Sequence, residues 1–168
     1  MAEGVIEPLR PAHERASFTC GKDPLDTFLR SLVSQYEKRR LGRTFVATPA
    51  GDLRVAGYYT LAAAAFDPGA LPKPERKKLP RHPVPVIHVG RLAVDQASRG
   101  QRLGETLLFH ALRTALEVAE KLGAYAVDVR AIDDEARAFY AKYGFLPLAD
   151  DPLHLYLPMK TVEALFGP

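Results

Sequence analysis

Apolar residues return along the chain with helical spacing in two segments. In residues 103–122 they recur every three or four positions and Gly123 follows, which predicts a long helix that ends at this glycine. Residues 25, 28, 29, 32, 33 and 36 form a second apolar stripe behind Asp23 and Pro24. Aspartate and proline are typical of helix starts, so we expect one continuous helix here with Asp23 as its N-cap.

Short apolar or alternating runs predict the strands of a sheet. They lie at residues 5–9, 44–48, 53–61, 86–94, 125–130, 145–148 and 153–159. A turn at residues 49–52 joins the second and third runs into a hairpin. The run 86–94 is apolar on both faces, which is typical of a central strand. A short helix at 135–143, capped by Asp133 or Asp134, and an amphipathic end at 161–166 complete the pattern.

The expected elements alternate in the order β-α-β-β-β-α-β-α-β-β, which indicates an α/β sheet with helices packed on it. Residues 67–85 are rich in proline and basic side chains. We expect a surface excursion there, with at most one helical turn near residues 75–79. No repeat or linker divides the sequence, so a single domain over residues 1–168 is the simplest interpretation.

Composition narrows the cellular setting. The chain has 168 residues, of which 47% are hydrophobic and 26% charged, as is ordinary for one globular domain. The lone Cys20 has no disulfide partner within the chain, which fits a reducing compartment, and we expect it to be a buried small side chain. The first ten residues do not resemble a signal peptide, and no apolar run reaches the roughly 18 residues of a membrane span. We therefore expect a soluble, cytoplasmic protein with no membrane partner.

The formal net charge is only +3, but the basic residues gather in two runs. The first holds Arg30, Lys38, Arg39, Arg40 and Arg43, and the second holds Lys73, Arg76, Lys77, Lys78 and Arg81. Acidic residues concentrate instead in the last third of the chain. A polyanionic partner and a pair of solvated cationic surfaces both fit this distribution.

A glycine-containing turn lies between the expected central strand and the long helix. Its sequence is Arg99-Gly100-Gln101-Arg102-Leu103-Gly104. A turn that enters a helix presents unpaired N–H groups and the positive end of the helix dipole, a combination suited to phosphates. The two glycines allow close backbone approach, and the two arginines can add charge-assisted hydrogen bonds. The pattern is neither a dinucleotide-binding fingerprint nor a P-loop.

This turn resembles the Arg/Gln-x-x-Gly-x-Gly/Ala turn of the GNAT acetyltransferases. The segments 90–95 (GRLAVD) and 136–145 (ARAFYAKYGF) resemble two further parts of that family's pattern, in the same order. The resemblance implies a GNAT fold, with a mixed central sheet, a splayed strand pair and helices on both faces. It also implies acetyl-CoA as acetyl donor. One position departs from the family: Arg102 stands where a glycine is usual.

The resemblance assigns roles to particular residues. Tyr140 would donate a proton to the departing sulfur, since a phenol with a pKa near ~10 is protonated at neutral pH. The cofactor-binding set that the resemblance implies is Leu92, Ala93 and Val94 for the pantetheine arm, Arg99, Gly100, Gln101, Arg102, Leu103, Gly104, Glu105 and Thr106 for the pyrophosphate, and Asp133 and Phe139. No metal is expected.

No general base follows from the sequence. His88 lies on the expected central strand, but a single strand histidine is more often structural, and Glu105 and Asp95 have local explanations at the helix start and the turn. An acceptor amine with a lowered pKa needs little help from a base. The α-amine of an aminoacyl ester is of this kind, whereas a lysine with a pKa near ~10.4 would need more assistance.

A narrower resemblance covers the N-terminal half. Segments 18–21 (FTCG), 25–29 (LDTFL), 43–46 (RTFV) and 57–61 (GYYTL) are similar to the GNAT toxins of type II toxin–antitoxin modules. Those toxins acetylate the α-amino group of aminoacyl-tRNA and so block translation. A ribbon-helix-helix antitoxin neutralises them, and a homodimer is also in keeping with the family. The residues that this resemblance assigns to tRNA are Lys38, Arg39, Arg40, Arg43, Lys73, Arg76, Lys77, Lys78, Arg81 and Arg91.

Two other functions stay open at this point. The same fold could acetylate a peptide, a protein or a small amine, because unrelated acceptors share this scaffold. Alternatively, the domain could be a non-catalytic module that binds CoA or a regulatory partner, to which Arg102 points. Tyr140 and the regular strand before the turn argue against this second alternative.

Overall fold

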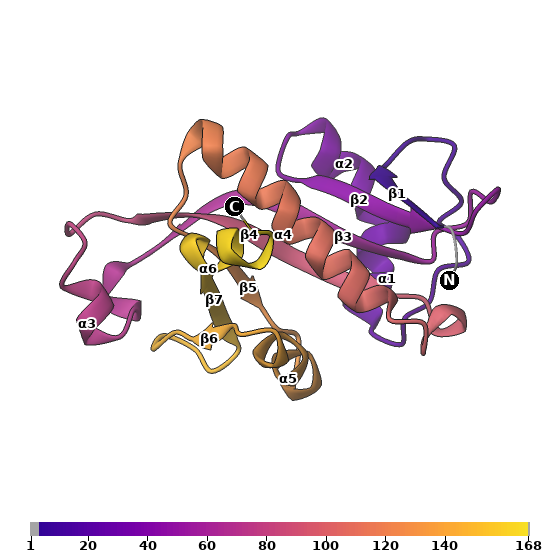
Figure 1. The fold of residues 1–168 in the computed structure, drawn as a ribbon. Coiled ribbons are helices and arrows are strands. Elements are labelled where there is room, and N and C mark those ends of the chain that lie inside the picture. Colours follow the sequence, from indigo (N-terminus) through magenta and orange to yellow (C-terminus); the bar gives the residue numbers. More distant parts are fainter. Residues whose placement is uncertain (1–3, 168) are drawn as a thin grey trace. The chain divides into compact units, whose positions relative to one another are not determined.

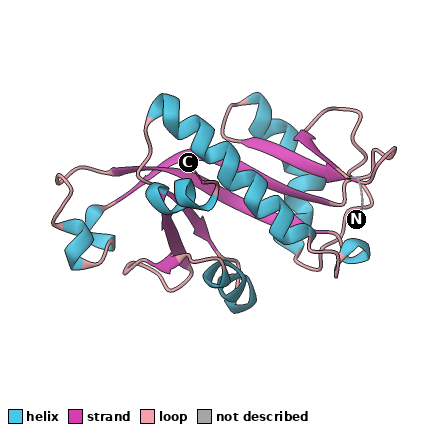
Figure 2. Ribbon diagram, viewed as in Figure 1, coloured by secondary structure: helices cyan, strands magenta, loops and turns pink. Residues whose placement is uncertain are grey.

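A computed structural model describes residues 4–167, and its strands and helices alternate along the chain (Figures 1 and 2). The strands are hydrogen-bonded in the order β1-β2-β3-β4-β5-β7-β6. The chain forms two compact units. The first contains the residues up to Ala62 together with Gly90–Ala111, and the second contains Ala63–Val89 together with the residues from Leu112 onward. A single domain over the whole chain stays a prediction.

The first unit contains an antiparallel arrangement of β1 (Val5–Pro8), β2 (Arg43–Thr48) and the beginning of β3 (Gly57–Phe66). The hairpin between β2 and β3 is confirmed, although β3 begins later than expected. Leu53 and Val55 bond instead to the backbone of Glu14. Leu53 and Val55 therefore pair with the segment that follows β1, and the chain pairs with β2 as a strand only from Gly57 onward.

The helix expected after Asp23 is interrupted. It consists of α1 (Asp23–Thr27), the π-helix η1 (Phe28–Leu32) and α2 (Val33–Lys38). The wider π turn shifts the apolar stripe, so that Leu32 is 39% exposed. The prediction of Asp23 as N-cap is also wrong, because Lys22 is the N-cap, with extended backbone and no side-chain capping bond.

The second unit contains the remaining strands. Residues Val86–Val89 of β4 (Val84–Val94) pair in parallel with β5 (Ala126–Arg130). On the other side of β5 lie β7 (His154–Pro158) and then β6 (Leu146–Pro147), both antiparallel. The proline-rich excursion between β3 and β4 carries the 3-10 turn η2 (Pro68–Ala70) and the short α3 (Lys73–Arg76) (Figure 1). It has no long helix, as expected, but η2 was not predicted and the helical turn begins at Lys73, earlier than the predicted residues 75–79.

The long helix α4 (Leu103–Leu122) matches its predicted range. Its apolar stripe supplies the buried Leu107, Leu108, Ala111, Leu112 and Ala115. Gly123 follows with a φ of +82°, the left-handed conformation in which helices commonly end.

Two shorter helices complete the second unit. They are α5 (Asp134–Lys142) and α6 (Met159–Leu165), which contacts β5 and β7. Among residues 4–167, no helix has the length and apolar character that crossing a membrane requires.

Candidate active site

Asp95 fixes the turn that follows β4. Its carboxylate accepts the backbone N–H of Ala97 (3.0 Å) and thereby caps the 3-10 turn η3 (Gln96–Ser98). The other carboxylate oxygen accepts the N–H of Thr19 (2.8 Å), and the Gln96 N–H donates to the Thr19 carbonyl (2.8 Å). Asp95 therefore shapes the turn as expected. It also ties the turn to a segment 76 residues earlier in the chain, which sequence reasoning missed.

Arg99 also links this turn to the segment that contains Thr19 and Cys20. Its guanidinium donates to the Cys20 carbonyl (2.5 Å). Gly21, next in the chain, has a φ of +90°, and a Cβ built there would lie 2.9 Å from the side-chain nitrogen of Gln96. The backbone conformation favours glycine here, whereas the close contact is with the flexible end of the Gln96 side chain, which could move aside. A phosphate contact by Arg99 stays a prediction, and the structure adds a positioning role.

The turn itself is open where a ligand would approach. Gly100 has a φ of +82°, and a Cβ there would meet nothing within 4 Å. Gln101 and Arg102 are exposed, and Arg102 has a φ of +57°. This left-handed conformation explains why a glycine is usual at the position of Arg102.

The helix start behind the turn has the geometry of an anion site. The backbone N–H and the hydroxyl of Thr106 both donate to the Arg102 carbonyl, each at 3.1 Å. The N–H groups of the residues just before Thr106 therefore lie ahead of the first i→i−4 hydrogen bond of the helix. Leu103 is buried and anchors the helix, while Gly104 and Glu105 are half-buried. Backbone donors and the helix dipole thus meet at the open turn.

The end of β4 leads directly into this turn. Ala93 is buried, whereas Leu92 and Val94 are half-buried. The Asp95 N–H donates to the Ala56 carbonyl (2.8 Å), which holds the end of the strand. The three residues expected to pair with a pantetheine arm therefore continue into the turn expected to hold its phosphates.

Tyr140 lies on α5 in the second unit. Its ring is 5% exposed and packs against Phe139 (centroids 5.3 Å apart) and Phe145 (5.5 Å). Burial raises the pKa of Tyr140 above that of an ordinary phenol. The hydroxyl therefore stays protonated at neutral pH and can donate a proton. Asp133 caps the same helix by accepting the N–H of Ala136 (2.9 Å).

The first basic run lies at the end of α2 in the first unit. Lys38 and Arg39 are exposed, and Arg40 is in the left-handed conformation with a φ of +57°. Arg43 pairs with Glu37 (2.8 Å). This pairing removes part of the positive field that the sequence predicted here.

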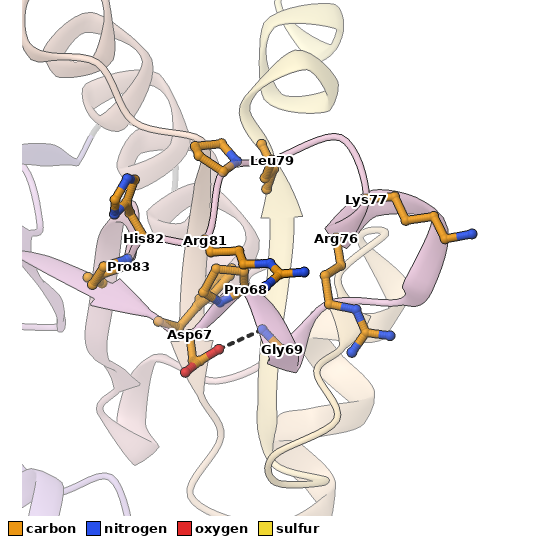
Figure 3. Close-up of a pocket in the computed structure, with 12 residues that line it drawn as sticks. Asp67, Pro68, Gly69, Arg76, Lys77, Leu79, Arg81, His82 and Pro83 are labelled. Carbon is orange, nitrogen blue, oxygen red and sulfur yellow. Dashed lines mark hydrogen bonds between the residues drawn. The ribbon is translucent and has the colours of Figure 1, made fainter.

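The second basic run surrounds a pocket of about 870 Å³ in the second unit (Figure 3). Arg76, Lys77, Arg81 and His82 line it together with apolar residues and Asp67. In Figure 3 Lys77 points away from the other basic side chains. Of the predicted tRNA contacts, Arg76, Lys77 and Arg81 thus share one pocket lining, with the Lys77 side chain directed away, and His82, which was not predicted from the sequence, lies in the same lining.

Arg91 has a different environment from the other predicted tRNA contacts. Its guanidinium lies 3.7 Å from the centroid of the Phe28 ring and 5.2 Å from that of Tyr36. Phe28 also stacks on the buried Tyr58 (6.1 Å). Arg91 thus joins β4 to the aromatic residues of η1 and α2 by cation–π contacts. Its assignment to tRNA stays a prediction.

Two further candidates for site chemistry concern Cys20 and metal ions. Burial, reinforced by a hydrogen bond with Asp26, raises the pKa of Cys20 to about 11, so the thiol is protonated and a poor nucleophile at neutral pH. Among residues 4–167 no group of three or more His, Cys, Asp or Glu side chains could hold a metal ion.

A strand that leads into an open turn at a helix start fits an acyl-CoA-dependent transferase, among other phosphate-binding folds. Residues 16–145 match the model of the Acetyltransferase (GNAT) family. The chain belongs to this family, and the predicted GNAT fold is confirmed.

Several relatives bear on the narrower resemblance to GNAT toxins. The chain is 39% identical to a tRNA-acetylating toxin of Mycobacterium tuberculosis (strain ATCC 25618 / H37Rv), over 93% of this chain and 92% of the relative. It superposes on AtaT complexed with acetyl-methionyl-tRNAfMet with a TM-score of 0.90 and 31% identity, covering 98% of this chain and 99% of that one. A mutant AtaT toxin bound to the C-terminus of the antitoxin AtaR and acetyl-CoA gives a TM-score of 0.85 at 27% identity, over 98% and 99%. The predicted similarity to GNAT toxins is thus confirmed.

Proposed function

We propose that this protein transfers the acetyl group of acetyl-CoA to the α-amino group of aminoacyl-tRNA and so inhibits translation. The observation that carries the proposal is the similarity to a tRNA-acetylating toxin over nearly the full length of both chains. The similarity to AtaT in complex with an acetylated aminoacyl-tRNA supports the same acceptor. Acetylation of the α-amine removes the nucleophile that peptide-bond formation needs.

The residues after β4 fit acetyl-CoA. The pyrophosphate would lie against the exposed turn Gly100–Arg102 and the first N–H groups of α4, where a Cβ is absent at Gly100 and the dipole favours negative charge. The backbone of Leu92–Val94 would pair with the pantetheine arm. Acetyl-CoA supplies an activated thioester, and the chain supplies its position.

Tyr140 would complete the transfer as a general acid. When the carbon–sulfur bond breaks, the thiolate of CoA needs a proton, and a phenol, which is protonated at neutral pH, can donate it. Phe139 and Phe145 hold the ring on either side. This role requires the hydroxyl alone, so phenylalanine in place of Tyr140 would keep the packing and lose the proton.

The exposed basic residues would hold the tRNA backbone. Lys73, Arg76, Lys77, Lys78 and Arg81 form a cationic stretch that is little compensated by the neighbouring Glu75. Phosphate contacts of this kind give affinity and orientation without reading the sequence. Lys38, Arg39 and Arg40 would contribute from the first unit, since they too are exposed.

The surroundings of the protein follow from the same proposal. An antitoxin that binds the toxin through its C-terminus is the expected partner, because the related AtaT is bound in this way by AtaR. A substrate such as aminoacyl-tRNA supports a cytoplasmic location for the protein. A homodimer stays a prediction of the family resemblance.

The decisive experiment is acetyl transfer from labelled acetyl-CoA to charged and to deacylated tRNA. We expect label on charged tRNA only, and a fall in rate of roughly 10²-fold for Tyr140→Phe with unchanged acetyl-CoA affinity. Tyr143→Phe, the same chemical change three residues along the chain, is the matched control and should keep its rate. Labelling of deacylated tRNA, or no labelling of tRNA despite tight acetyl-CoA binding, would contradict the proposed acceptor.

A further inference from the structure

Four titratable side chains form a continuous hydrogen-bonded row in the second unit. Nδ1 of His88 lies 2.9 Å from one carboxylate oxygen of Asp128, and Nε2 of His154 lies 2.7 Å from the other. Nδ1 of His154 lies 2.9 Å from the carboxylate of Asp150. Asp128 and His154 are 4% and 2% exposed, so the middle of the row is buried. The row has no part in the function as proposed so far.

The register of the sheet builds this row. His88 on β4 is the pairing partner of Asp128 on β5, and His154 lies at the start of β7, opposite Arg130 of β5. Side chains two apart on a strand share a face, which places Asp128 beside both histidines. Asp150 belongs to the loop before β7, and Arg130 lies 3.7 Å from it.

One placement of the protons satisfies every hydrogen bond of the row. Both ring nitrogens of His154 face carboxylate oxygens, which accept hydrogen bonds and donate none when ionised. The two bonds are satisfied when His154 donates from both nitrogens, to Asp128 and to Asp150. The remaining oxygen of Asp128 then accepts the Nδ1–H of His88. Nε2 of His88 takes no part in these bonds, so in the neutral tautomer it carries the lone pair, as in a histidine that acts as a base.

The place of His88 on β4 suits this chemistry. Positions 88, 90, 92 and 94 form the half-buried face of the strand, and the side chain of His88 is 25% exposed. The turn proposed to hold the phosphates follows Val94, so a pantetheine arm that runs back along Leu92–Val94 would bring its thioester toward Gly90 and His88 of the same strand. An acceptor amine would therefore meet the thioester on the side of the strand where His88 lies.

We propose that His88 is the general base of the acetyl transfer and that Asp128, His154 and Asp150 are positioning residues that hold its proton on Nδ1. The inference rests on the acetyl transfer of the proposed function. The amine lone pair attacks the thioester carbonyl carbon, and a nitrogen–carbon bond forms while the carbon–sulfur bond breaks. Nε2 of His88 takes the proton that the amine loses, Tyr140 supplies one to the sulfur, and both residues return to their starting states by exchange with water.

The charged groups around the row define its pH response. Asp128 faces His88 from β5, His154 follows from β7, and Asp150 and Asp151 face Arg130 at the surface end, with Arg130 3.6 Å from Asp151. A cluster with a purely structural role would affect stability when altered and would leave the pH dependence of the rate unchanged. The pH profile therefore separates the two roles.

The test uses His88→Asn in the full-length protein. Asparagine keeps an N–H that can donate to Asp128 and lacks the second ring nitrogen. With aminoacyl-tRNA as acceptor, both the amine and His88 must lose a proton, so the acid limb of log kcat/KM should have a slope near 2 in the wild type and near 1 in the variant. We expect a fall in kcat/KM of about 10²-fold above neutral pH, with acetyl-CoA affinity unchanged. An unchanged slope would overturn the proposal.

Two measurements keep this test separate from the choice of acceptor. Hydrolysis of acetyl-CoA replaces the amine by water, so its rate should depend on one ionisation in the wild type and on none in His88→Asn, whatever the outcome with tRNA. Nitrogen chemical shifts of the wild-type histidines should show His88 protonated on Nδ1, and in Asp128→Asn this preference should disappear. The opposite ring tautomer in the wild type, or hydrolysis with the same pH dependence in His88→Asn, refutes the base. Transfer to small amines but not to tRNA refutes only the acceptor.

Discussion

Replacement of Arg102 by glycine separates two effects that this residue combines. Its φ of +57° lies in the left-handed region, which costs a residue with a Cβ about 1–2 kcal/mol. Glycine avoids this strain but loses about 0.5–1 kcal/mol more backbone entropy on folding. Arg102→Gly should therefore raise the free energy of unfolding by roughly 0.5–1 kcal/mol, which is about 1–4 °C in Tm for a chain of this size.

Two matched variants isolate the backbone term. Arg102→Ala also loses the guanidinium but keeps a Cβ in the left-handed conformation, so its stability should stay near that of the wild type. Arg40 has the same φ of +57°, and Arg40→Gly should gain a similar stability without any change in acetyl-CoA affinity. Urea unfolding followed by circular dichroism measures all three. Equal stability of Arg102→Gly and Arg102→Ala would refute the reasoning from backbone strain.

The same variants measure the side chain's contribution to cofactor binding. An exposed arginine beside a phosphate contributes little, so Kd for acetyl-CoA should rise roughly two- to fivefold in both Arg102→Gly and Arg102→Ala. Acetyl-pantetheine, which lacks the pyrophosphate, should bind the wild type and both variants alike. Calorimetric titration of the two ligands checks this. A loss of acetyl-pantetheine affinity would place the effect of Arg102 away from the phosphates.

Three further predictions concern other parts of the molecule. Gly21→Ala should lower the free energy of unfolding by about 1–3 kcal/mol, because alanine is strained at a φ of +90° and its Cβ must also displace the end of the Gln96 side chain, 2.9 Å away. Urea unfolding measures the change, and Gly51→Ala, with nothing near its Cβ, reports the cost of positive φ alone. The double variant Lys77→Glu, Lys78→Glu should slow the acetylation of tRNA and make its rate less dependent on salt, while the affinity for acetyl-CoA is unchanged. Unchanged tRNA kinetics would show that these lysines do not contact tRNA. Burial raises the pKa of Cys20 to about 11, so the folded chain keeps the thiol proton to higher pH than the unfolded chain. The contribution of this proton to stability should therefore be lost as pH rises from about 9 to about 11. Cys20→Ala should lack that part of the pH dependence of stability, and an identical profile in the variant would contradict the raised pKa.

The sequence predicted a secondary-structure element well where the spacing of apolar residues and a residue that ends the element indicate the same bounds. Helix α4 has a strong apolar stripe and ends before Gly123, so its range was predictable. The interruption at Phe28–Leu32 was not, because a π turn changes the helical rise without any glycine or proline to mark it. The late start of β3 depends on the long-range bonds of Leu53 and Val55 to Glu14, which leave no trace in local pattern.

The same limit applies to the candidate site. The turn Arg99–Gly104 was predictable because its residues are contiguous and their order carries the chemistry. The row from His88 to Asp150 was not, since its members come from β4, β5, β7 and a loop. Only the register of the strands places Asp128 between the two histidines. In the sequence His88 is a single histidine on an expected strand. The sequence does not show which side chains lie beside it.

The bonds from Thr19 and Cys20 to Asp95, Gln96 and Arg99 make the turn a shared property of two distant segments. A ligand that orders the turn is therefore expected to order residues 19–21 as well. By thermodynamic linkage, a partner of residues 19–21 whose affinity changes when the cofactor binds must change the affinity for the cofactor by the same factor. Amide hydrogen exchange at Thr19 and Gln96 should slow together when acetyl-CoA binds. The segment before α1 could in this way regulate the cofactor site through its hydrogen bonds to Asp95, Gln96 and Arg99.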